Sequence, residues 1–386
     1  MLKQNLDCNN LKPIDIENEL KKYVFGQDEY LKKLSVFACK HMDNIRFVKQ
    51  GAEPINNNLL VVGGSGCGKT YALKQLAKLL DVPFIEVDGS ALQSNNYRGQ
   101  MHARSIFNEA LQRYGTERVK KSILFIDEFD KTLDVYALNT TGSHMVQRDL
   151  LKLFENGPKY PVGDIDGRGI NVGLEEIGFL DTRAISIVCA GSYAESYSAY
   201  QGDEKQEVNN KIGFDVNNNL EKPKNNKKTL DAEDLIRLGN LPELIGRFST
   251  IVNVNSLTKE DMVNILTSAK GTTLGKYIDA LSLSNVSTKF STEFCKKIVD
   301  YVQDDNTGFR GADKILNHVF ETVIYDAKNN SNINKVYLDS VNNDVTVTYK
   351  FSNSPRQLRN VVDLSKFITK SSLNKNRTSY SIRTLV

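Results

Sequence analysis

The stretch that decides the fold reads Leu59-Leu60-Val61-Val62-Gly63-Gly64-Ser65-Gly66-Cys67-Gly68-Lys69-Thr70. Its first four residues form a short apolar run, which is typical of a buried parallel strand. The next eight match GxxxxGK[ST], a P-loop whose backbone N–H groups wrap phosphates at the start of a helix. Apolar residues recur at helical spacing over 70–80, so the motif has the flanking elements that it requires. We expect Lys69 to reach the β- and γ-phosphates of a nucleotide and Thr70 to hold Mg²⁺.

A second apolar run, Ile123–Ile126, ends in two acids, Asp127 and Glu128. A carboxylate at a strand end can bind the Mg²⁺ ion of a nucleotide, and we assign this role to Asp127. Glu128 beside it is expected to polarise an attacking water as a general base. Such strand ends are also common as solvated acids, but the position about 60 residues after the P-loop favours a hydrolytic site.

Further apolar runs at 84–87 and 184–188 add to the predicted strands. Strands that alternate with helices predict an α/β fold, in which a parallel sheet is covered by helices. After residue 255 the pattern changes to three predicted helices, at 259–278, 292–303 and 311–328, followed by a strand pair near 335–338 and 345–349. We therefore predict a large α/β domain followed by a smaller, mostly helical lid domain.

Composition excludes several classes of protein. The chain of 386 residues contains no run of ~18 apolar residues, so nothing in it is expected to span a membrane. Its N-terminus lacks the apolar region of a secretory signal. The five cysteines are scattered without CxxC spacing, which argues against a zinc finger or a disulfide framework. A reducing cytoplasm is the expected location.

Charge and polarity suggest the domain boundaries. Residues 351–386 carry seven Lys or Arg and one acid, a net charge of +6, whereas the other 350 residues carry 43 basic and 46 acidic side chains, or −3. Nucleic acid is therefore not an expected partner except through this tail. The polar stretch 201–229 predicts an exposed loop. The expected organisation is an extension (1–20), a large domain (21–255), a small domain (256–350) and a basic tail (351–386).

Several motifs, taken in order along the chain, resemble those of AAA+ ATPases, and in detail those of the ClpX/HslU branch of protein unfoldases. Besides the P-loop, the segments that carry the resemblance are Tyr23–Gln27, Asp81–Phe84, Ile126–Lys131, Leu241–Arg247 and Gly308–Gly311. The resemblance covers about residues 20–350, and only the P-loop is specific by itself. It implies an ATPase that uses ATP and Mg²⁺, assembles as a hexameric ring and unfolds proteins.

The resemblance also implies roles for individual residues. Val24 and Phe25 match the hydrophobic segment that covers the adenine. Arg247 matches the arginine finger that reaches the γ-phosphate of a neighbouring subunit, and Arg310 matches the second-sensor arginine of the small domain. Without the family match, either arginine could be a surface ion-pair residue. We place the first sensor at Ser192, although the usual polar residue is not evident there.

Substrate handling is inferred from two further segments. Ser94–Gln100 resembles the first pore loop, in which Tyr97 would grip an extended polypeptide, with Arg98 and Gly99 beside it. Within the 201–229 loop, the tripeptide Ile212, Gly213, Phe214 resembles the one that docks ClpX on the ClpP peptidase. Because Ile177-Gly178-Phe179 repeats this tripeptide at a place with an expected structural role, the motif alone leaves peptidase docking open.

The chain also departs from the family. ClpX has an N-terminal zinc-binding domain with four cysteines, whereas this chain has only Cys8 in that region. The segment 157–173 contains Lys159 and Arg168 but not the family's basic triplet, so we expect a different choice of substrate. The four histidines have no metal-ligand spacing and are interpreted as structural or surface residues; they are His41, His102, His144 and His318.

Three functions remain in competition at this point. The leading hypothesis is a ring-forming, ATP-dependent unfoldase or remodelling chaperone that threads unfolded or tagged proteins through an axial pore, with or without delivery to a ClpP-type peptidase. The alternative is a nucleic-acid-associated AAA+ loader or translocase, which the basic tail would support. A third reading, a slowly hydrolysing nucleotide-gated scaffold, is disfavoured because Lys69, Asp127, Glu128, Arg247 and Arg310 are all present.

Overall fold

The computed structural model describes residues 11–92, 103–133, 145–165, 171–172, 178–193, 229–268, 271–302, 308–341, 344–352 and 354–364. It divides into two compact units. The large unit consists of Met1–Leu20, Asp28–Gly64 and Lys69–Val254, and the small unit consists of Lys21–Gln27, Ser65–Gly68 and Asn255–Val386. No helix among the described residues is long and apolar enough to cross a bilayer.

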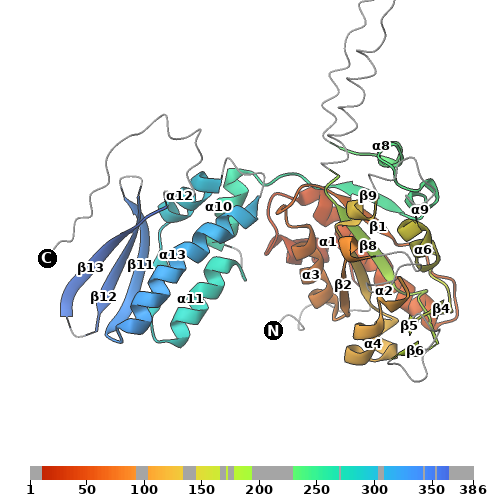
Figure 1. Ribbon diagram of the computed structural model, residues 1–386, viewed down its shortest axis with the longest axis horizontal. Coiled ribbons are helices and arrows are strands. Elements are labelled where there is room, and N and C mark those ends of the chain that lie inside the picture. The colour runs from red at the N-terminus through yellow and green to blue at the C-terminus, as the bar shows by residue number, and fades with distance from the viewer. Residues whose placement is uncertain are drawn as a thin grey trace, which may run out of the picture. The chain divides into compact units, whose positions relative to one another are not determined.

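A five-stranded sheet forms the centre of the large unit (Figure 1). Its spatial order is β2 (Phe84–Asp88), β3 (Ile123–Asp127), β8 (Ser186–Gly191), β1 (Leu59–Val62) and β9 (Thr250–Asn253). All four pairings are parallel. Strands β1 and β8 are buried along their whole length, which explains why they read as apolar runs in the sequence. The predicted α/β fold is confirmed.

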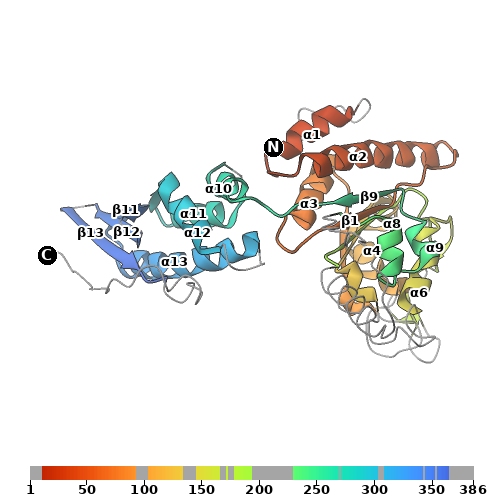
Figure 2. The ribbon, with the colours of Figure 1, turned by 90° about the horizontal axis from the view of Figure 1, so that it is seen from above.

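The helices of the large unit are α1 (Pro13–Lys21), α2 (Asp28–Lys49), α3 (Lys69–Leu80), α4 (Asn108–Tyr114), α5 (Thr116–Val119), α6 (Met145–Phe154), α8 (Ala232–Arg237) and α9 (Pro242–Ile245). Helix α1 lies beside α2 (Figure 2) and buries Ile16 and Leu20 completely or nearly so. Because these two side chains are four residues apart on one helical face, the segment 13–20 packs onto the large unit. The described part of the expected N-terminal extension (1–20) thus belongs to the large unit.

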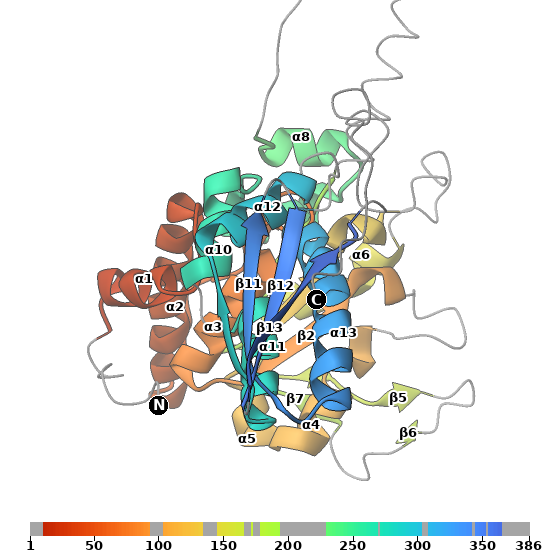
Figure 3. The same ribbon diagram turned by 90° about the vertical axis from the view of Figure 1, so that its left-hand side faces the viewer.

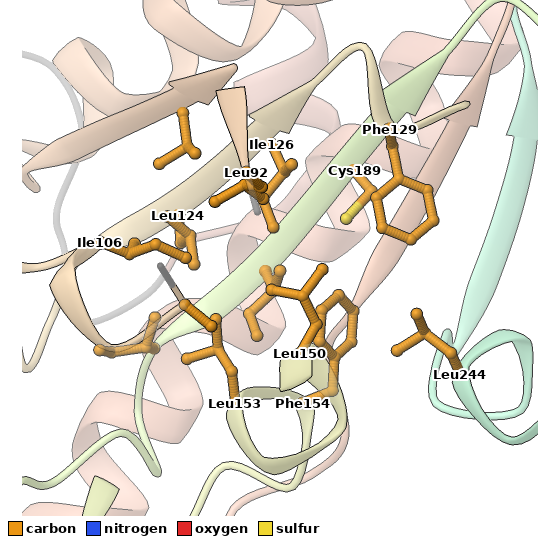
Figure 4. Packing of buried hydrophobic residues seen from close by; sticks show 14 of the residues in the cluster. Leu92, Ile106, Leu124, Ile126, Phe129, Leu150, Leu153, Phe154, Cys189 and Leu244 are labelled. Atoms are coloured by element: carbon orange, nitrogen blue, oxygen red, sulfur yellow. The ribbon is translucent and has the colours of Figure 1, made fainter. Parts of the chain in front are cut away.

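The apolar core of the large unit lies between the sheet and α6 (Figure 4). Leu124 and Ile126 of β3 and Leu150 and Leu153 of α6 are fully buried there. Phe248 packs against the edge of this core, where its ring and that of Phe154 are in edge-to-face contact with centroids 5.2 Å apart. Truncating one of these leucines to alanine would cost about 2–5 kcal/mol. The core therefore fixes the segment that carries Arg247, one residue before Phe248.

Two short hairpin-like pairings lie outside the central sheet. Strand β4 (Tyr160–Pro161) pairs antiparallel with β7 (Phe179–Leu180), and β5 (Asp164–Ile165) pairs antiparallel with β6 (Asn171–Val172). The second copy of the tripeptide thus ends in a strand. Phe179 is 62% exposed, whereas Leu180 is buried.

In the part of the small unit that the structure describes, four helices are combined with a four-stranded sheet. The helices are α10 (Lys259–Ser268), α11 (Thr273–Leu283), α12 (Thr292–Val302) and α13 (Phe309–Asn329), and the sheet order is β10 (Ser287–Phe290), β11 (Ile333–Val341), β12 (Asp344–Phe351), β13 (Ser354–Val362). β10 and β11 run parallel, and the other two pairings are antiparallel. Figure 3 shows β11, β12 and β13 side by side. The described helices α11, α12 and α13 lie on one face of this sheet (Figure 1).

The small unit differs from the sequence prediction in two places. The single helix expected at 259–278 is two helices, because Gly271 has a left-handed backbone (φ 77°) and Thr272 caps α11 by accepting a hydrogen bond from Gly275 N. The segment from 351, expected to be a basic tail, contains the last residue of β12 and all of β13, in which Leu358 and Val362 face the core. Core-facing and outward-facing residues alternate along this strand, but the basic residues made the pattern hard to recognise in the sequence. Residues 365–386 lie outside the described residues.

His41 of α2 is buried completely and serves the packing of the large unit. Its Nδ1 lies 2.9 Å from Ser186 Oγ, and its Nε2 lies 3.2 Å from the carbonyl oxygen of Lys121. Burial lowers the pKa of His41 from 6.5 to about 4, because the charged ring would lose its hydration.

This pKa predicts a pH dependence of stability. Between pH 6.5 and pH 4 the unfolded chain binds a proton that the folded chain excludes, so this contribution to stability is complete above pH 6.5 and declines as the pH falls to 4. We expect a loss of about 3 kcal/mol in the free energy of unfolding of the large unit from pH 7 to pH 4. Urea unfolding at a series of pH values measures it. His41→Gln should be less stable than the wild type at pH 7, and its free energy of unfolding should not show the loss of about 3 kcal/mol between pH 7 and pH 4.

His318→Gln, which changes a partly exposed histidine of α13, serves as the control and should keep the wild-type profile. An unchanged pH dependence in His41→Gln would contradict the assignment.

Candidate functional site

The P-loop joins the carboxyl end of β1 to the start of α3. Gly63 N donates a hydrogen bond to Gly191 O of the neighbouring strand (3.0 Å), and a Cβ at Gly63 would lie 2.7 Å from the carbonyl oxygen of Val254. Only glycine therefore fits at this point. Lys69 Nζ donates to the carbonyl oxygens of Gly63 (2.5 Å) and Gly64 (2.7 Å). These bonds hold the ammonium group at the centre of the loop, where it can meet phosphate oxygens.

Thr70 and Asp127 lie in direct contact, although they come from different elements. Thr70 Oγ1, in the first turn of α3, donates to Asp127 Oδ2 at the end of β3 over 3.0 Å. Mg²⁺ takes oxygen ligands and keeps one or two from protein when nucleotide phosphates supply others. This hydroxyl–carboxylate pair fits that requirement. Among the described residues, no cluster of three or more His, Cys, Asp or Glu could hold a metal ion unaided.

Glu128 stands on a strained turn at the end of β3. Its backbone is left-handed (φ 50°), and its own N–H donates to Asp127 Oδ1 over 3.0 Å. A non-glycine residue in this conformation costs about 1–2 kcal/mol, which must be offset by its surroundings. Gly89 packs against the turn, since a Cβ there would lie 2.7 Å from Glu128 O. The turn leaves the Glu128 side chain exposed beside Asp127.

Ser192 is connected to this turn by a hydrogen bond to the buried carboxylate of Asp130. Asp130, two residues beyond Glu128, is only 6% exposed and accepts hydrogen bonds from Ser192 Oγ and Tyr193 N, both over 3.1 Å. The Ser192 hydroxyl, our expected first sensor, is therefore linked to the segment that follows the strand end. Gly191, which precedes Ser192, pairs with Val62 and accepts the hydrogen bond of Gly63 N, so Ser192 follows β8 beside the start of the P-loop.

The same network continues toward α9. Tyr193 is fully buried, and its hydroxyl donates to Asn240 Oδ1 over 3.3 Å. Burial, with the Asp130 carboxylate nearby, raises the pKa of Tyr193 well above its usual range, so its hydroxyl stays protonated. Gln147 Nε2 donates to the same Asn240 oxygen (3.2 Å), and Gln147 Oε1 accepts from Leu241 N at the start of α9 (2.8 Å).

Sequence reasoning missed Gln147 and Asn240. Neither belongs to a motif. The only signal for Gln147 was an amide on the inward face of α6, and Asn240 lies outside the helices. Both are now seen to be buried polar groups with satisfied hydrogen bonds, which is the usual condition for keeping such groups in a core.

Arg247 lies at the far end of β1 from the P-loop. Its carbonyl oxygen accepts hydrogen bonds from Asn56 Nδ2 (3.1 Å) and Asn58 Nδ2 (3.3 Å), and Asn58 directly precedes β1. From Asn58 to Gly63 the strand spans about 16 Å. The Arg247 guanidinium instead pairs with Glu155 over 3.5 Å, with both side chains about half exposed. The structure therefore does not bring Arg247 to Lys69 and Asp127 of its own chain.

Within the small unit, Ser65–Gly68 of the P-loop contacts the segment Lys21–Gln27. Gln27 Nε2 donates to the carbonyl oxygens of Cys67 (3.4 Å) and Asn255 (2.7 Å). Val24 and Phe25 precede Gln27 in this segment; Val24 is buried and Phe25 is partly exposed. The two residues expected to cover the adenine are thus in a segment tied to the P-loop.

Gly308 brings the start of α13 against the same loop. Its backbone is left-handed (φ 55°), and a Cβ would lie 2.9 Å from Ser65 O and 3.1 Å from Gly66 O. Phe309 N donates to Gly66 O over 3.4 Å. Arg310 follows in the first turn of α13 and is exposed. The expected second-sensor arginine is therefore held within the unit that contains this part of the P-loop.

The expected pore-loop residues Tyr97, Arg98 and Gly99 lie outside the described residues, as do Ile212, Gly213 and Phe214.

The close approach of Gly308 predicts a sharp effect of one methyl group. Gly308→Ala should displace the P-loop backbone and raise the Kd for ATP by about ten-fold or more, since shifts near 1 Å are costly at such sites. Titration with a fluorescent ATP analogue measures the affinity. Gly51→Ala is the matched control, because Gly51 is also left-handed (φ 75°) but has open space around it. Equal Kd values for the two variants would refute the contact.

Comparisons with known proteins agree with this geometry. Residues 59–197, which contain the P-loop, Asp127 and Glu128, match the ATPase family associated with various cellular activities (AAA). An ATP-dependent Clp protease ATP-binding subunit ClpX from Porphyromonas gingivalis is 30% identical over 345 residues, covering 83% of this chain and 79% of the relative. ClpX from Bacteroides fragilis is 30% identical over 338 residues (82% and 76%), and ClpX 2 from Wolinella succinogenes is 29% identical over 332 residues (84% and 80%). With its P-loop, acidic strand end and lengthwise similarity to these relatives, the chain belongs to the ClpX family of AAA+ ATPases.

Proposed function

We propose that this ATPase is a ring-forming protein unfoldase or remodelling chaperone that threads polypeptide through an axial pore. The observation that carries the proposal is the position of Arg247, about 16 Å along β1 from the P-loop of its own chain. A guanidinium that is exposed and remote from its own nucleotide site can serve the site of a second copy. Head-to-tail contacts form a ring when the rotation between neighbouring copies closes, and we propose a homo-hexamer of this kind.

The hydrolytic site is proposed to work through five side chains. Lys69 neutralises the β- and γ-phosphates of ATP, while Thr70 and Asp127 would hold Mg²⁺. When bound, Mg²⁺ offsets the negative charge that develops on the phosphates. Glu128 orients the attacking water and accepts its proton. Arg247 of a neighbouring copy stabilises the charge on the γ-phosphate at the transition state.

The roles that we propose for Arg310, Val24 and Phe25 come from the family resemblance, and their place in the small unit supports them. Arg310 would respond to the γ-phosphate, while Val24 and Phe25 would cover the adenine. The contacts of Gly308 and Gln27 with Ser65–Gly68 support this proposal, because they couple these segments to the phosphate-binding loop.

The buried network offers a route from the nucleotide to the subunit boundary. Asp130 lies two residues beyond Glu128 in the same turn, and the chain of hydrogen bonds through Tyr193, Asn240 and Gln147 ends at the first residue before α9. Arg247 follows α9. We propose that Ser192 senses the nucleotide through Asp130, and that this network ties its state to the position of the arginine finger.

Substrate and partner assignments rest on resemblance and on the names of the relatives. Tyr97, with Arg98 and Gly99, would grip an extended polypeptide in the pore. The relatives are named as ATP-binding subunits of a Clp protease. A ClpP-type peptidase, docked through Ile212, Gly213 and Phe214, is therefore the proposed partner for degradation.

The ring proposal predicts complementation between two inactive variants. Lys69→Ala should fail to use ATP but still offers Arg247, whereas Arg247→Ala keeps its P-loop but lacks the finger. Each alone should hydrolyse ATP at about 1% of the wild-type rate or less. When they are mixed in equal amounts, about a quarter of the head-to-tail interfaces combine an intact P-loop with an intact arginine, so activity should return. A coupled ATPase assay and the unfolding of a tagged fluorescent protein are the two measurements.

The variant Tyr97→Ala, measured in the same two assays, distinguishes ATP hydrolysis from the gripping of polypeptide in the pore. It should retain most of the ATPase activity and lose the ability to unfold the tagged protein.

In the mixing experiment, no recovery of ATPase activity, with both Lys69→Ala and Arg247→Ala shown to assemble with wild-type chain, would contradict the action of Arg247 on a neighbouring copy. Normal unfolding by Tyr97→Ala would contradict the pore assignment while leaving the ATPase site intact.

A further inference from the structure

The sheet of the small unit has one face turned away from its helices, and this face is basic. Side chains alternate along a strand, and Val336, Leu338, Val345, Val347 and Tyr349 are all buried on the helix side. The opposite parity presents Lys289 of β10, Lys335 of β11, Lys350 of β12 and Arg359 of β13, all exposed. We call this surface, together with Tyr337 and Thr348, the basic face.

The strand register places an aromatic ring among these cations. Lys289 pairs with Tyr337, Tyr337 with Thr348, and Thr348 with Arg359, so the four form one row across all four strands. Tyr337 is 40% exposed. Neighbouring strands are about 4.8 Å apart, so the row extends across about 14 Å of surface. Tyr337 therefore has Lys289 on one side of it and Lys335 two residues away along its own strand.

The next row contains a pairing that is unfavourable for folding. Lys335 of β11 lies directly opposite Lys350 of β12. Like charges in directly opposed positions destabilise a sheet. Among the residues that the structure describes, Lys289, Lys335, Lys350 and Arg359 have no ion-pair partner, whereas Lys259, Lys296 and His318 of the same unit pair with Asp300, Glu293 and Glu321. An anion lying over this pair would remove the repulsion.

Acidic residues on this face lie at its other end, toward the turn between β11 and β12. Asp339 is two residues beyond Tyr337, and Asp344 begins β12. The carboxylate of Asp339 is already engaged, because its Oδ1 accepts from Ser291 Oγ (2.6 Å) and Ser340 N (2.8 Å). Arg359 Nη2 lies 3.4 Å from Thr346 Oγ1 rather than on an acid. The cations therefore remain available at one end of the face.

We propose that the basic face binds single-stranded nucleic acid. The cations would contact phosphates, and the Tyr337 ring would stack on a base. A positively charged surface combined with an exposed aromatic ring is the pattern by which proteins bind single strands without reading their sequence. Four-stranded sheets that present aromatic side chains are used in this way for RNA.

Charge complementarity alone would also suit an acidic polypeptide, and Tyr337 favours the nucleic acid. Edge lysines such as Lys289 are a common protection against edge-to-edge pairing, but Lys335 and Lys350 occupy the two inner strands, where this explanation does not apply. The face is formed by folded strands, so the proposal does not depend on the basic residues beyond 364. It also does not depend on the unfoldase function, because binding needs no ATP.

The experiment measures binding of the full chain to a fluorescent oligothymidylate of about 20 nucleotides by anisotropy at several salt concentrations. Lys335→Gln combined with Lys350→Gln should weaken binding by about ten-fold or more and make the slope of log K against log salt less steep by about 1.4. Tyr337→Ser should weaken binding by about five-fold or more.

Matched controls come from the same unit. Lys314→Gln combined with Lys328→Gln removes the same charge from exposed positions of α13, and Tyr325→Ser removes a tyrosine that is 71% exposed on that helix. Both controls should bind within about two-fold of the wild type. The thermal midpoint of the double variant of the sheet should be equal to or higher than that of the wild type, because the opposed charges are gone.

Loss of binding in the sheet variants but not in the controls would support the proposal. Equal effects of the sheet and helix variants would overturn it, since binding would then reflect net charge or the residues beyond 364. Binding of a polyglutamate peptide, measured in the same way, tests the alternative that the face binds an acidic polypeptide. If the peptide binds more tightly than the oligonucleotide and is indifferent to Tyr337→Ser, the occupant is an acidic polypeptide and the proposal fails.

Discussion

The hydrogen bond between Thr70 and Asp127 is the contact on which the catalytic arrangement depends. Its two residues belong to α3 and to the end of β3, and in the sheet β3 is separated from β1 by the whole width of β8. The contact therefore requires parallel strands in register, so that their carboxyl ends meet at one edge. The buried apolar strands β1, β3 and β8 supply that register. Without it, the hydroxyl and the carboxylate could not share one ion.

A second constraint follows from the first. The turn after Asp127 forces Glu128 into a left-handed conformation and sends Asp130 into the core, where its charge must be met by hydrogen bonds. Ser192 and Tyr193 meet it, and their neighbours Asn240 and Gln147 extend the network toward α9. A half-satisfied network of this kind would be costly in a low-dielectric core, so its members are fixed together. The segment carrying Arg247 thus depends on the geometry of the acidic strand end.

Much of this arrangement could be predicted from the sequence, for physical reasons. Fully buried strands and a P-loop have strong local signals, so the elements β1, β3 and α3 were predicted where the structure has them. The expectation that Thr70 and Asp127 lie together agrees with their hydrogen bond. Gln147, Asn240 and Gly308 could not be predicted, because their importance comes from contacts with residues distant in sequence. β13 was missed for a different reason. Its charge, with Arg356 and Arg359, suggested a solvated tail, whereas the alternation of Leu358, Asn360 and Val362 determined its fold.

The central claim is that hydrolysis at Glu128 drives polypeptide through a ring, and one substrate-trapping measurement tests it most directly. Glu128→Gln should keep ATP bound without hydrolysing it, so whatever the ring handles should remain attached. The variant would be expressed and isolated with ATP present, and mass spectrometry would identify what is released when ATP is withdrawn. We expect unfolded or tagged polypeptides, together with a peptidase if degradation follows. Recovery of nucleic acid without any polypeptide client would contradict the claim.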